Sequence, residues 1–511
     1  SRMLQKSYTR NYLNIYLFQT LSIVLGFVSL FVVIPYLSGN KEIYGIYSIC
    51  ISVTVFFSYA DLGFLSAGTK YAAECYTRNE EQNELKYLGF SHFILFICML
   101  LFSVLFILVG FNPEWLVKGL DSMEKYKTAQ RLFFILAVFA PTTVLQRLPQ
   151  MILSIRVKQH LYQQIQIVGN LIKIASVFYF FTGGRYNIVG YFFMLQLITL
   201  LCSLITCVKI KRVFHYDFKG FWTYFRFSKA VFQNTYVLAL SSLVVTVCWV
   251  LYYELDSMAI GKILGAEEVA VYAIGFTILN FFRSLLGVLF SPFNTRFNHF
   301  YGLGNIEELK HFYRNIILMT FPLIVFPILA LTYATKPFIL SWVGSSYESS
   351  VQITQWLILC NILAFVAYPA GILLYALEKI KVMYWVNIIS VILFWLGIAL
   401  TINRWGTESF AIFKFPTFLL SGVIYIKISS NFLQKSLVQF MKEIILPYLP
   451  ALFLLCIVLF FSHAFFMEEK SWFALFVNIG IIIINMGIVM IFSVLMIPQL
   501  KSYLLKLKHE F

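Results

Sequence analysis

Long runs of apolar residues, separated by short polar segments, recur from one end of the chain to the other. About 20 consecutive apolar residues suffice to cross a bilayer as a helix. Cutting the chain at clusters of charge, glycine and proline predicts fourteen such spans, and hence an all-α polytopic membrane protein. The predicted spans are Tyr12–Leu37, Tyr44–Ser66, Tyr87–Gly110, Ala129–Leu148, Gln163–Thr182, Ile188–Val208, Thr235–Met258, Val269–Phe293, Ile316–Ala334, Ile353–Leu377, Val382–Ile402, Phe410–Ile428, Ile444–Phe466 and Trp472–Ile497.

Composition agrees with lipid as the solvent. Of 511 residues, 60% are hydrophobic and 12% charged, against roughly 25% charged in an average soluble domain. The eight cysteines lie mostly in apolar runs without any C-x-x-C pair or Cys/His cluster, so we expect neither disulfides nor a metal site.

The net charge of +16 is distributed unevenly between the two sets of loops. The loops on the side of the termini carry 26 Lys and Arg residues, and the opposite loops carry ten. By the positive-inside rule, both termini are expected in the cytoplasm. The longest opposite loop, residues 111–128, is too short for a folded catalytic domain.

A weak internal repeat joins the second and eighth predicted spans. A shift of 225 residues aligns residues 42–49 with residues 267–274, and Phe56-Phe57 with Phe281-Phe282. Transporters are commonly built from such repeats, with the substrate path between them. We therefore expect two six-helix lobes around a central cavity, residues 1–208 and 231–430, joined by residues 209–230 and followed by two further helices within residues 431–511.

Three cations lie within predicted spans, where an unpaired charge costs several kcal/mol and usually faces a water-filled cavity. Lys173 lies in the fifth span on one polar helix face with Gln163, Gln166 and Asn170. A face of that polarity indicates a lumen.

Arg283 lies midway along the eighth span with Thr277 and Asn280 near its face, and Lys414 begins a polar stripe in the twelfth. A cationic cavity attracts an anion, and arginine suits phosphate or carboxylate. The alternative is that each cation pairs within the fold or snorkels to the interface. Arg147, at the predicted end of the fourth span, is a weaker candidate that could equally be a positive-inside anchor.

The acidic candidates lie near span ends. Asp61 could cap the loop that follows it or pair with Lys70 across an inner gate. Glu254 and Asp256, near the outer end of the seventh span, could bind a coupling cation, form an outer gate, or be solvated.

The segment joining the lobes mixes cations with aromatic residues, from Lys209 to His215 and from Phe221 to Arg226. This composition favours an anionic membrane surface over nucleic acid.

Several motifs give the chain a family resemblance. Residues 34–49 (IPYLSGNKEIYGIYSI), 59–64 (YADLGF) and 69–74 (TKYAAE) resemble the first two helices of Wzx-type polysaccharide flippases. Asp256, residues 261–265 (GKILG) and 271–274 (VYAI) resemble their seventh and eighth helices.

The resemblance implies the multidrug/oligosaccharidyl-lipid/polysaccharide exporter superfamily, whose two six-helix lobes form a V around a central cavity. It implies a flippase that moves undecaprenyl-diphosphate-linked oligosaccharide across the bacterial cytoplasmic (inner) membrane by alternating access, as in O-antigen and lipopolysaccharide biosynthesis. Similar lipid II flippases carry arginines in the first helix, whereas the first span here has none inside it.

No cofactor is expected, and Na⁺ and H⁺ are the candidate coupling ions. The expected partners are the lipid-linked substrate and membrane lipid, with a polysaccharide polymerase and a chain-length regulator as candidate protein partners. We expect a monomer that binds no nucleic acid. The alternatives are a cation-coupled multidrug exporter of the same superfamily and a membrane polymerase or ligase. The seven histidines form no catalytic pair, so we expect no enzyme.

Overall fold

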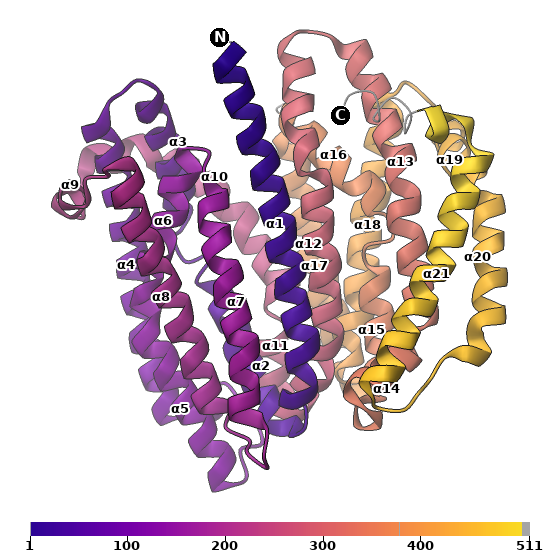
Figure 1. Cartoon of the computed structure of the whole chain (residues 1–511), viewed down its shortest axis with the longest axis horizontal. Helices are drawn as coiled ribbons and strands as arrows, with labels where there is room; N and C mark the ends of the chain where they lie inside the picture. Colours follow the sequence, from indigo (N-terminus) through magenta and orange to yellow (C-terminus); the bar gives the residue numbers. More distant parts are fainter. Residues whose placement is uncertain (1, 378, 503–511) are drawn as a thin grey trace. The chain divides into compact units, whose positions relative to one another are not determined.

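The chain folds into helices throughout its length, as the apolar runs predict (Figure 1). This computed structural model describes residues 2–377 and 379–502, and no β-strand occurs among them. Within these ranges, twelve helical segments are long and apolar enough to cross a membrane, and one bent helix pair is a thirteenth candidate. The prediction of an all-α polytopic membrane protein is confirmed.

The helices divide between two compact units, unit 1 (Ser1–Ala270) and unit 2 (Val271–Phe511). Unit 1 contains α1 (Arg2–Leu37), α2 (Lys41–Phe56), α3 (Phe64–Thr77), α4 (Glu81–Phe111), α5 (Met123–Phe139), α6 (Thr143–Ile155), α7 (Gln159–Phe181), α8 (Ile188–Phe214), α9 (Phe218–Tyr224), α10 (Lys229–Trp249) and α11 (Asp256–Ile263). Helix α12 (Ala266–Gly302) begins at the boundary. Unit 2 continues with α13 (Ile306–Tyr333), α14 (Thr335–Val343), α15 (Ser350–Leu359), α16 (Ala364–Ala376), α17 (Ile380–Trp405), α18 (Glu408–Phe432), α19 (Leu437–Ile445), α20 (Leu449–Ser462) and α21 (Trp472–Met496).

Three predicted spans differ from the structure. Tyr44–Ser66 is not one continuous helix but the pair α2 and α3, with turns over residues 57–63. The predicted span Ile353–Leu377 is the pair α15 and α16, bent by 47°. The predicted span Ala129–Leu148 extends to Ile155, because Pro149 lies inside α6 instead of ending it. Fourteen unbroken spans is therefore too high a number for the described residues.

The break between α2 and α3 has a local cause. Leu62 and Gly63 both take positive φ angles, 54° and 81°, which a continuous right-handed helix cannot contain. Asp61 stabilises the restart, since its Oδ2 accepts a hydrogen bond from the backbone N–H of Leu65 at 2.9 Å. Gly63 is the N-cap residue and has no side chain to offer, so the Asp61 carboxylate, two residues earlier, satisfies an otherwise unpaired donor of the first turn. Of the alternatives for Asp61, the structure contains the capping hydrogen bond.

Glycines let α10 and the first residue of α12 approach the α2–α3 pair closely. A Cβ atom added to Gly63 would lie 2.3 Å from the carbonyl oxygen of Ala239 in α10, and one on Gly45 would lie 1.7 Å from that of Ala266. Small residues permit this kind of helix contact in membranes. The contacts place the seventh span within unit 1, so the boundary between the compact units falls at residue 270 and differs from the predicted lobe limits at 208 and 231.

The repeat has a counterpart in the helix bounds. The α2–α3 pair begins at Lys41 and ends at Thr77, and α12 begins at Ala266 and ends at Gly302, 225 residues later at both ends. This agrees with the sequence alignment, although one copy is broken and the other is continuous.

The segment that joins the two predicted lobes is partly docked on protein. Phe221 of α9 is fully buried and its ring lies 5.7 Å from that of His92 in α4. Trp222 and Phe227, in contrast, are 50% and 55% exposed. The buried aromatic residue of this segment therefore anchors α9 to α4. Only the exposed rings are available for the expected contact with the lipid surface.

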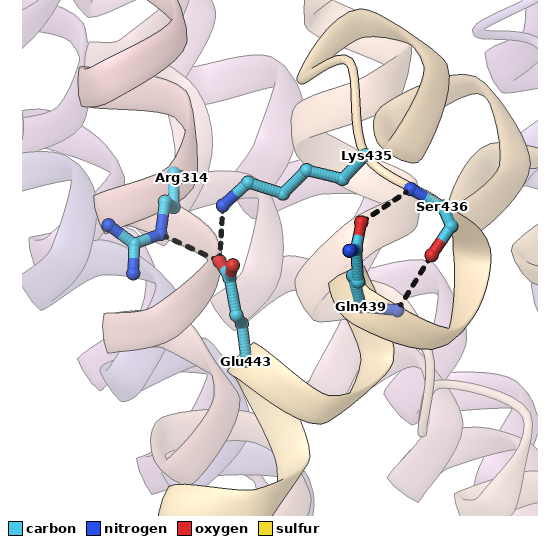
Figure 2. A network of polar contacts seen from close by, with 5 residues as sticks. All are labelled: Arg314, Lys435, Ser436, Gln439 and Glu443. Carbon is cyan, nitrogen blue, oxygen red and sulfur yellow. Dashed lines mark hydrogen bonds and ion pairs between the residues drawn. The ribbon is translucent and has the colours of Figure 1, made fainter.

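A polar network fixes α19, which leads into the last two helices. Glu443 binds both Arg314 of α13, at 3.2 Å, and Lys435, as Figure 2 shows. Ser436 and Gln439 form a reciprocal capping box at the start of α19, which satisfies two backbone donors. These contacts attach α19, which precedes the C-terminal hairpin α20–α21, to α13.

Candidate functional site

A polar pocket of about 310 Å³ lies inside unit 1, among the helices of the membrane-spanning bundle. Its walls come from the end of α2, the turn before α6, α6 itself and α8. The lining residues are Thr54, Phe57, Ser58, Phe139, Thr143, Gln146, Arg147, Gln150, Gln196 and Thr199. Eight of these ten carry polar side chains, which is unusual in a bundle surrounded by lipid.

Helix α6 supplies the main polar wall because its sequence is strongly two-faced. Thr143, Gln146, Arg147 and Gln150 recur at positions i, i+3, i+4 and i+7, so they share one face. The 3₁₀ turn Ala140–Thr142, which contains a proline, joins α5 to α6 within the single candidate span Met123–Ile155.

Lys173 of α7 lies beside this pocket. Its Nζ donates a hydrogen bond to the Oγ1 of Thr199, a wall residue on α8, at 2.9 Å. The predicted polar face of α7 is therefore directed partly towards α8, and Lys173 is brought together with Arg147 around the same pocket lining.

The same face of α7 also carries buried amide atoms. The Oε1 of Gln163 and the Nε2 of Gln166 are buried without a hydrogen-bond partner in the described part of the chain. Asn170 lies half-buried on this face. Buried amides without partners are uncommon in native proteins and mark places where water or a ligand completes the bonding.

Asp61 is the acidic neighbour of the pocket. Its carboxylate caps α3 and interacts electrostatically with Arg147. Lys70 is exposed on α3, with its Nζ 5.7 Å from the centre of the Tyr71 ring. The cation that the structure places near Asp61 is thus Arg147, whereas the predicted gate partner was Lys70.

Glu254 and Asp256 are buried, with exposed fractions of 5% and 1%. They lie where the seventh span is irregular, at the π-helical turn Val250–Glu254 and the first residue of α11. The Tyr59 hydroxyl, in the break of the second span, donates to the Oε1 of Glu254 at 3.4 Å. The alternative that these acids are simply solvated is therefore wrong, because they lie inside unit 1.

The remaining predicted cations belong to unit 2. Arg283 and Asn280 are half-buried on α12, and Arg283 interacts electrostatically with Tyr368 of α16. Lys414 of α18 is fully buried, with its Nζ 4.7 Å from the centre of the Phe394 ring. Lys414 is thus enclosed within unit 2, near aromatic rings of α12 and α17, and its role in substrate binding stays a prediction.

The sequence signal for this polar wall is the T-x-x-Q-R-x-x-Q pattern of residues 143–150, which was not among the predicted site residues. The predicted span ends at Leu148, which places Arg147 at a membrane boundary, whereas α6 continues through Pro149 to Ile155.

The chain resembles known proteins in part of its sequence and in its fold. The MatE family model matches residues 226–402. The solved structure of the lipid II flippase MurJ in an inward closed conformation aligns with a TM-score of 0.70 and 14% identity, over 94% of this chain and 98% of that one. The fold is that of MOP-superfamily transporters.

Two further structures of this fold align over most of the chain. An inward-facing multidrug resistance MATE family transporter of the MOP superfamily gives a TM-score of 0.61 at 13% identity, over 82% of this chain and 99% of that one. A MOP superfamily transporter from Pyrococcus furiosus, described as having a binding pocket of reverse polarity, gives 0.56 at 12%, over 84% and 97%. No curated protein matches the sequence. The structures named here are of a flippase and of transporters.

Proposed function

We propose that this protein is a flippase for a lipid-linked oligosaccharide with a diphosphate headgroup, and that unit 1 binds the phosphate groups. The observation that carries the proposal is the polar pocket containing Arg147, with Lys173 bonded to its wall. The structural likeness to the lipid II flippase supports the choice of a lipid-linked cargo.

The chemistry of the pocket suits a phosphate. A charged group at the centre of a span costs about 2.5–3.5 kcal/mol on insertion scales, so a headgroup crossing lipid needs donors that replace its water. Arg147 offers a planar fork of N–H donors, and Gln146 and Gln150 add amide donors on the same helix face. No covalent step is required, because alternate opening of the transporter to each side of the membrane moves the headgroup while the polyprenyl tail stays in lipid.

Asp61 connects this pocket to a coupling ion. When Asp61 is ionised it competes with a phosphate for Arg147, and a bound H⁺ or Na⁺ removes that competition. We propose Asp61 as the coupling residue, with Glu254 and Asp256 as a second acidic group in the same unit. Arg283 and Asn280 remain proposed substrate contacts in unit 2, whereas the burial of Lys414 suits a structural charge.

In its full form the proposal places the protein in a bacterial inner membrane with both termini in the cytoplasm. The cargo is then an undecaprenyl-diphosphate oligosaccharide moved to the periplasmic leaflet for O-antigen or other polysaccharide synthesis. A polymerase and a chain-length regulator would act on it afterwards. The 26 cations in the loops on the terminal side support this orientation.

The second candidate function is a multidrug exporter. The match of residues 226–402 to the MatE model favours it, as do the half-buried Asp61 and the buried Glu254 and Asp256, since carboxylates bind cationic drugs. The two functions require opposite charges on the cargo, so a single reconstituted system distinguishes them.

The test is transport in proteoliposomes containing the purified protein. A polyprenyl-diphosphate oligosaccharide with a fluorophore on its headgroup reports flipping through quenching by impermeant dithionite, and ethidium uptake reports drug transport. The double variant Arg147→Gln/Lys173→Gln is expected to slow flipping at least about tenfold, since each hydrogen bond to a charge contributes about 1.5–3 kcal/mol.

The matched control is Lys211→Gln/Arg212→Gln, which removes the same two charges from exposed positions in the last turn of α8. It is expected to flip at the wild-type rate. Unchanged flipping in the folded double variant would exclude the anion pocket, and ethidium transport without any flipping would establish the exporter instead.

A further inference from the structure

A second cavity, of about 540 Å³, lies wholly within unit 2 and takes no part in the site described above. It opens where α13 ends and α14 begins, and its floor is one face of α15. Its lining residues are Thr332, Lys336, Glu348, Ser349, Val351, Gln352, Gln355, Trp356, Leu359 and Glu408. Its volume is within the range of small-molecule sites.

One face of α15 provides both an aromatic ring and two amides. Gln352, Gln355 and Trp356 are spaced as neighbours on that face. Trp356 is half-buried and its ring centre lies 5.4 Å from that of Phe415, which supports it from behind. Gln355 donates its Nε2 to the carbonyl of Thr332 at 3.2 Å, which fixes the amide orientation, and Gln352 is exposed to the cavity mouth.

Carboxylates outnumber cations around this cavity, which is the reverse of the unit 1 pocket. Lys336 lies 3.2 Å from Glu348 and 4.0 Å from Glu468, and Glu408 contributes another carboxylate to the lining. The hydrogen bond to Glu348, and the charges of both glutamates, raise the pKa of Lys336 above its usual value. Three carboxylates against one lysine disfavour a phosphate or another anion in this cavity.

The surrounding backbone is held in place before any ligand enters. The Nδ2 of Asn478 in α21 donates to the Pro337 carbonyl and the Ser341 Oγ of α14, each at 3.0 Å. Its Oδ1 accepts from the Met467 backbone N–H at 2.9 Å. A fully buried asparagine thus joins α14, α21 and the loop between α20 and α21, which keeps one wall of the cavity rigid.

We infer that this cavity binds a sugar ring of a neutral or amino-substituted glycan, stacked on Trp356 and hydrogen-bonded by Gln352 and Glu408. Sugar rings combine an apolar C–H face with hydroxyl groups at the edge, so they suit an aromatic platform flanked by amides and carboxylates. The inference rests on the proposed function in taking the glycan of the transported lipid as the ligand. It adds a saccharide site in unit 2, separate from the phosphate pocket of unit 1.

Isothermal titration calorimetry on the full-length protein tests the inference. The probe is the water-soluble glycan released by mild acid from the lipid-linked oligosaccharides of the organism that makes the protein, so it carries neither phosphate nor lipid. The wild type is expected to bind it saturably. Gln352→Ala, at an exposed position, and Trp356→Ala are each expected to weaken binding about tenfold, which corresponds to about 1.4 kcal/mol, and Trp356→Phe is expected to recover most of the loss.

Trp385→Ala is the matched control, because Trp385 is 67% exposed on α17 and outside the cavity lining. It is expected to bind the glycan as the wild type does. Absence of saturable binding at millimolar glycan would overturn the inference, as would unchanged binding in Gln352→Ala, which decides the matter if Trp356→Ala does not fold. Saturable binding of tetraphenylphosphonium with no glycan binding would overturn the inference and assign the cavity to cations.

Failure of this inference is distinguishable from failure of the proposed function. Arg147→Gln/Lys173→Gln is expected to bind the released glycan normally while flipping slowly. Normal flipping in that variant together with glycan binding lost in Gln352→Ala would remove the phosphate pocket and keep the saccharide site.

Discussion

Removing one hydroxyl group should stabilise this protein. Tyr216 lies between α8 and α9, is 7% exposed, and has its ring 5.3 Å from the guanidinium carbon of Arg156. Its hydroxyl oxygen is buried without a hydrogen-bond partner among the described residues. Folding therefore removes this hydroxyl from water without replacing the lost bonds. We expect Tyr216→Phe to raise the free energy of unfolding.

The magnitude follows from the two groups involved. A buried polar group left unpaired costs about 1–3 kcal/mol, and phenylalanine keeps the ring that faces Arg156, with a somewhat weaker cation–π contact. A net gain of about 1 kcal/mol is expected at neutral pH.

The same substitution should change the alkaline stability. Burial, and to a lesser extent the nearby Glu84 carboxylate, raises the pKa of Tyr216 well above its usual value of 10.0. In the unfolded chain this tyrosine loses its proton near pH 10, whereas the folded protein keeps it, so stability falls as the pH rises above 10. A difference of one bound proton is a slope of about 1.4 kcal/mol per pH unit, and Tyr216→Phe should remove it.

Equilibrium unfolding in mixed micelles at pH 7.5 and from pH 10 to 11 measures both effects. Tyr76→Phe is the matched control, because the Tyr76 ring also faces Arg156, at 4.7 Å, but the residue is 41% exposed. It should change stability by less than about 0.5 kcal/mol. The reasoning is refuted if Tyr216→Phe destabilises the protein at pH 7.5, or if wild type and variant have the same alkaline slope.

Two further substitutions test the packing of unit 1. Gly63→Ala should cost about 2–4 kcal/mol by the same unfolding measurement, because φ is 81° and the new Cβ would lie 2.3 Å from the Ala239 carbonyl oxygen. Gly287→Ala, where a Cβ meets nothing within 4 Å, should be neutral or stabilising, and equal losses would contradict the steric argument. Arg156→Met breaks a 2.8 Å ion pair with Glu84 whose side chains are 10% and 3% exposed, so it should cost about 3–5 kcal/mol. Adding Glu84→Leu should recover most of that loss, and no recovery would show that the unpaired carboxylate is not the cause.

The spans were predictable because a helix that crosses lipid must contain about 20 consecutive apolar residues, and this requirement is visible in the sequence. The irregular places were not, because they depend on tertiary contacts. Asp61 and Gly63 indicate a loop near Leu62, but they do not show that a helix restarts at Phe64, and the close approach of Gly63 to α10 becomes visible only in the fold.

The candidate site shows the same limit in two residues. The predicted span placed Arg147 at its edge because a proline follows two residues later, although proline is tolerated inside membrane helices. Charge at membrane depth singled out Lys414 but not its surroundings, and the structure encloses it beside an aromatic ring. Polar spacing along a helix identified Lys173 correctly as a residue near polar groups, but it could not identify which helix face was enclosed.

The internal repeat gives a reason for the polar pocket in unit 1. The break in the second span turns the chain at residues 57–63, and Phe57 and Ser58 at its start are wall residues of the pocket. The position 225 residues after Ser58 is Arg283, on the continuous helix α12. The corresponding positions therefore carry different groups. The first copy has a small hydroxyl, which leaves space for a ligand, and the second copy has a cation.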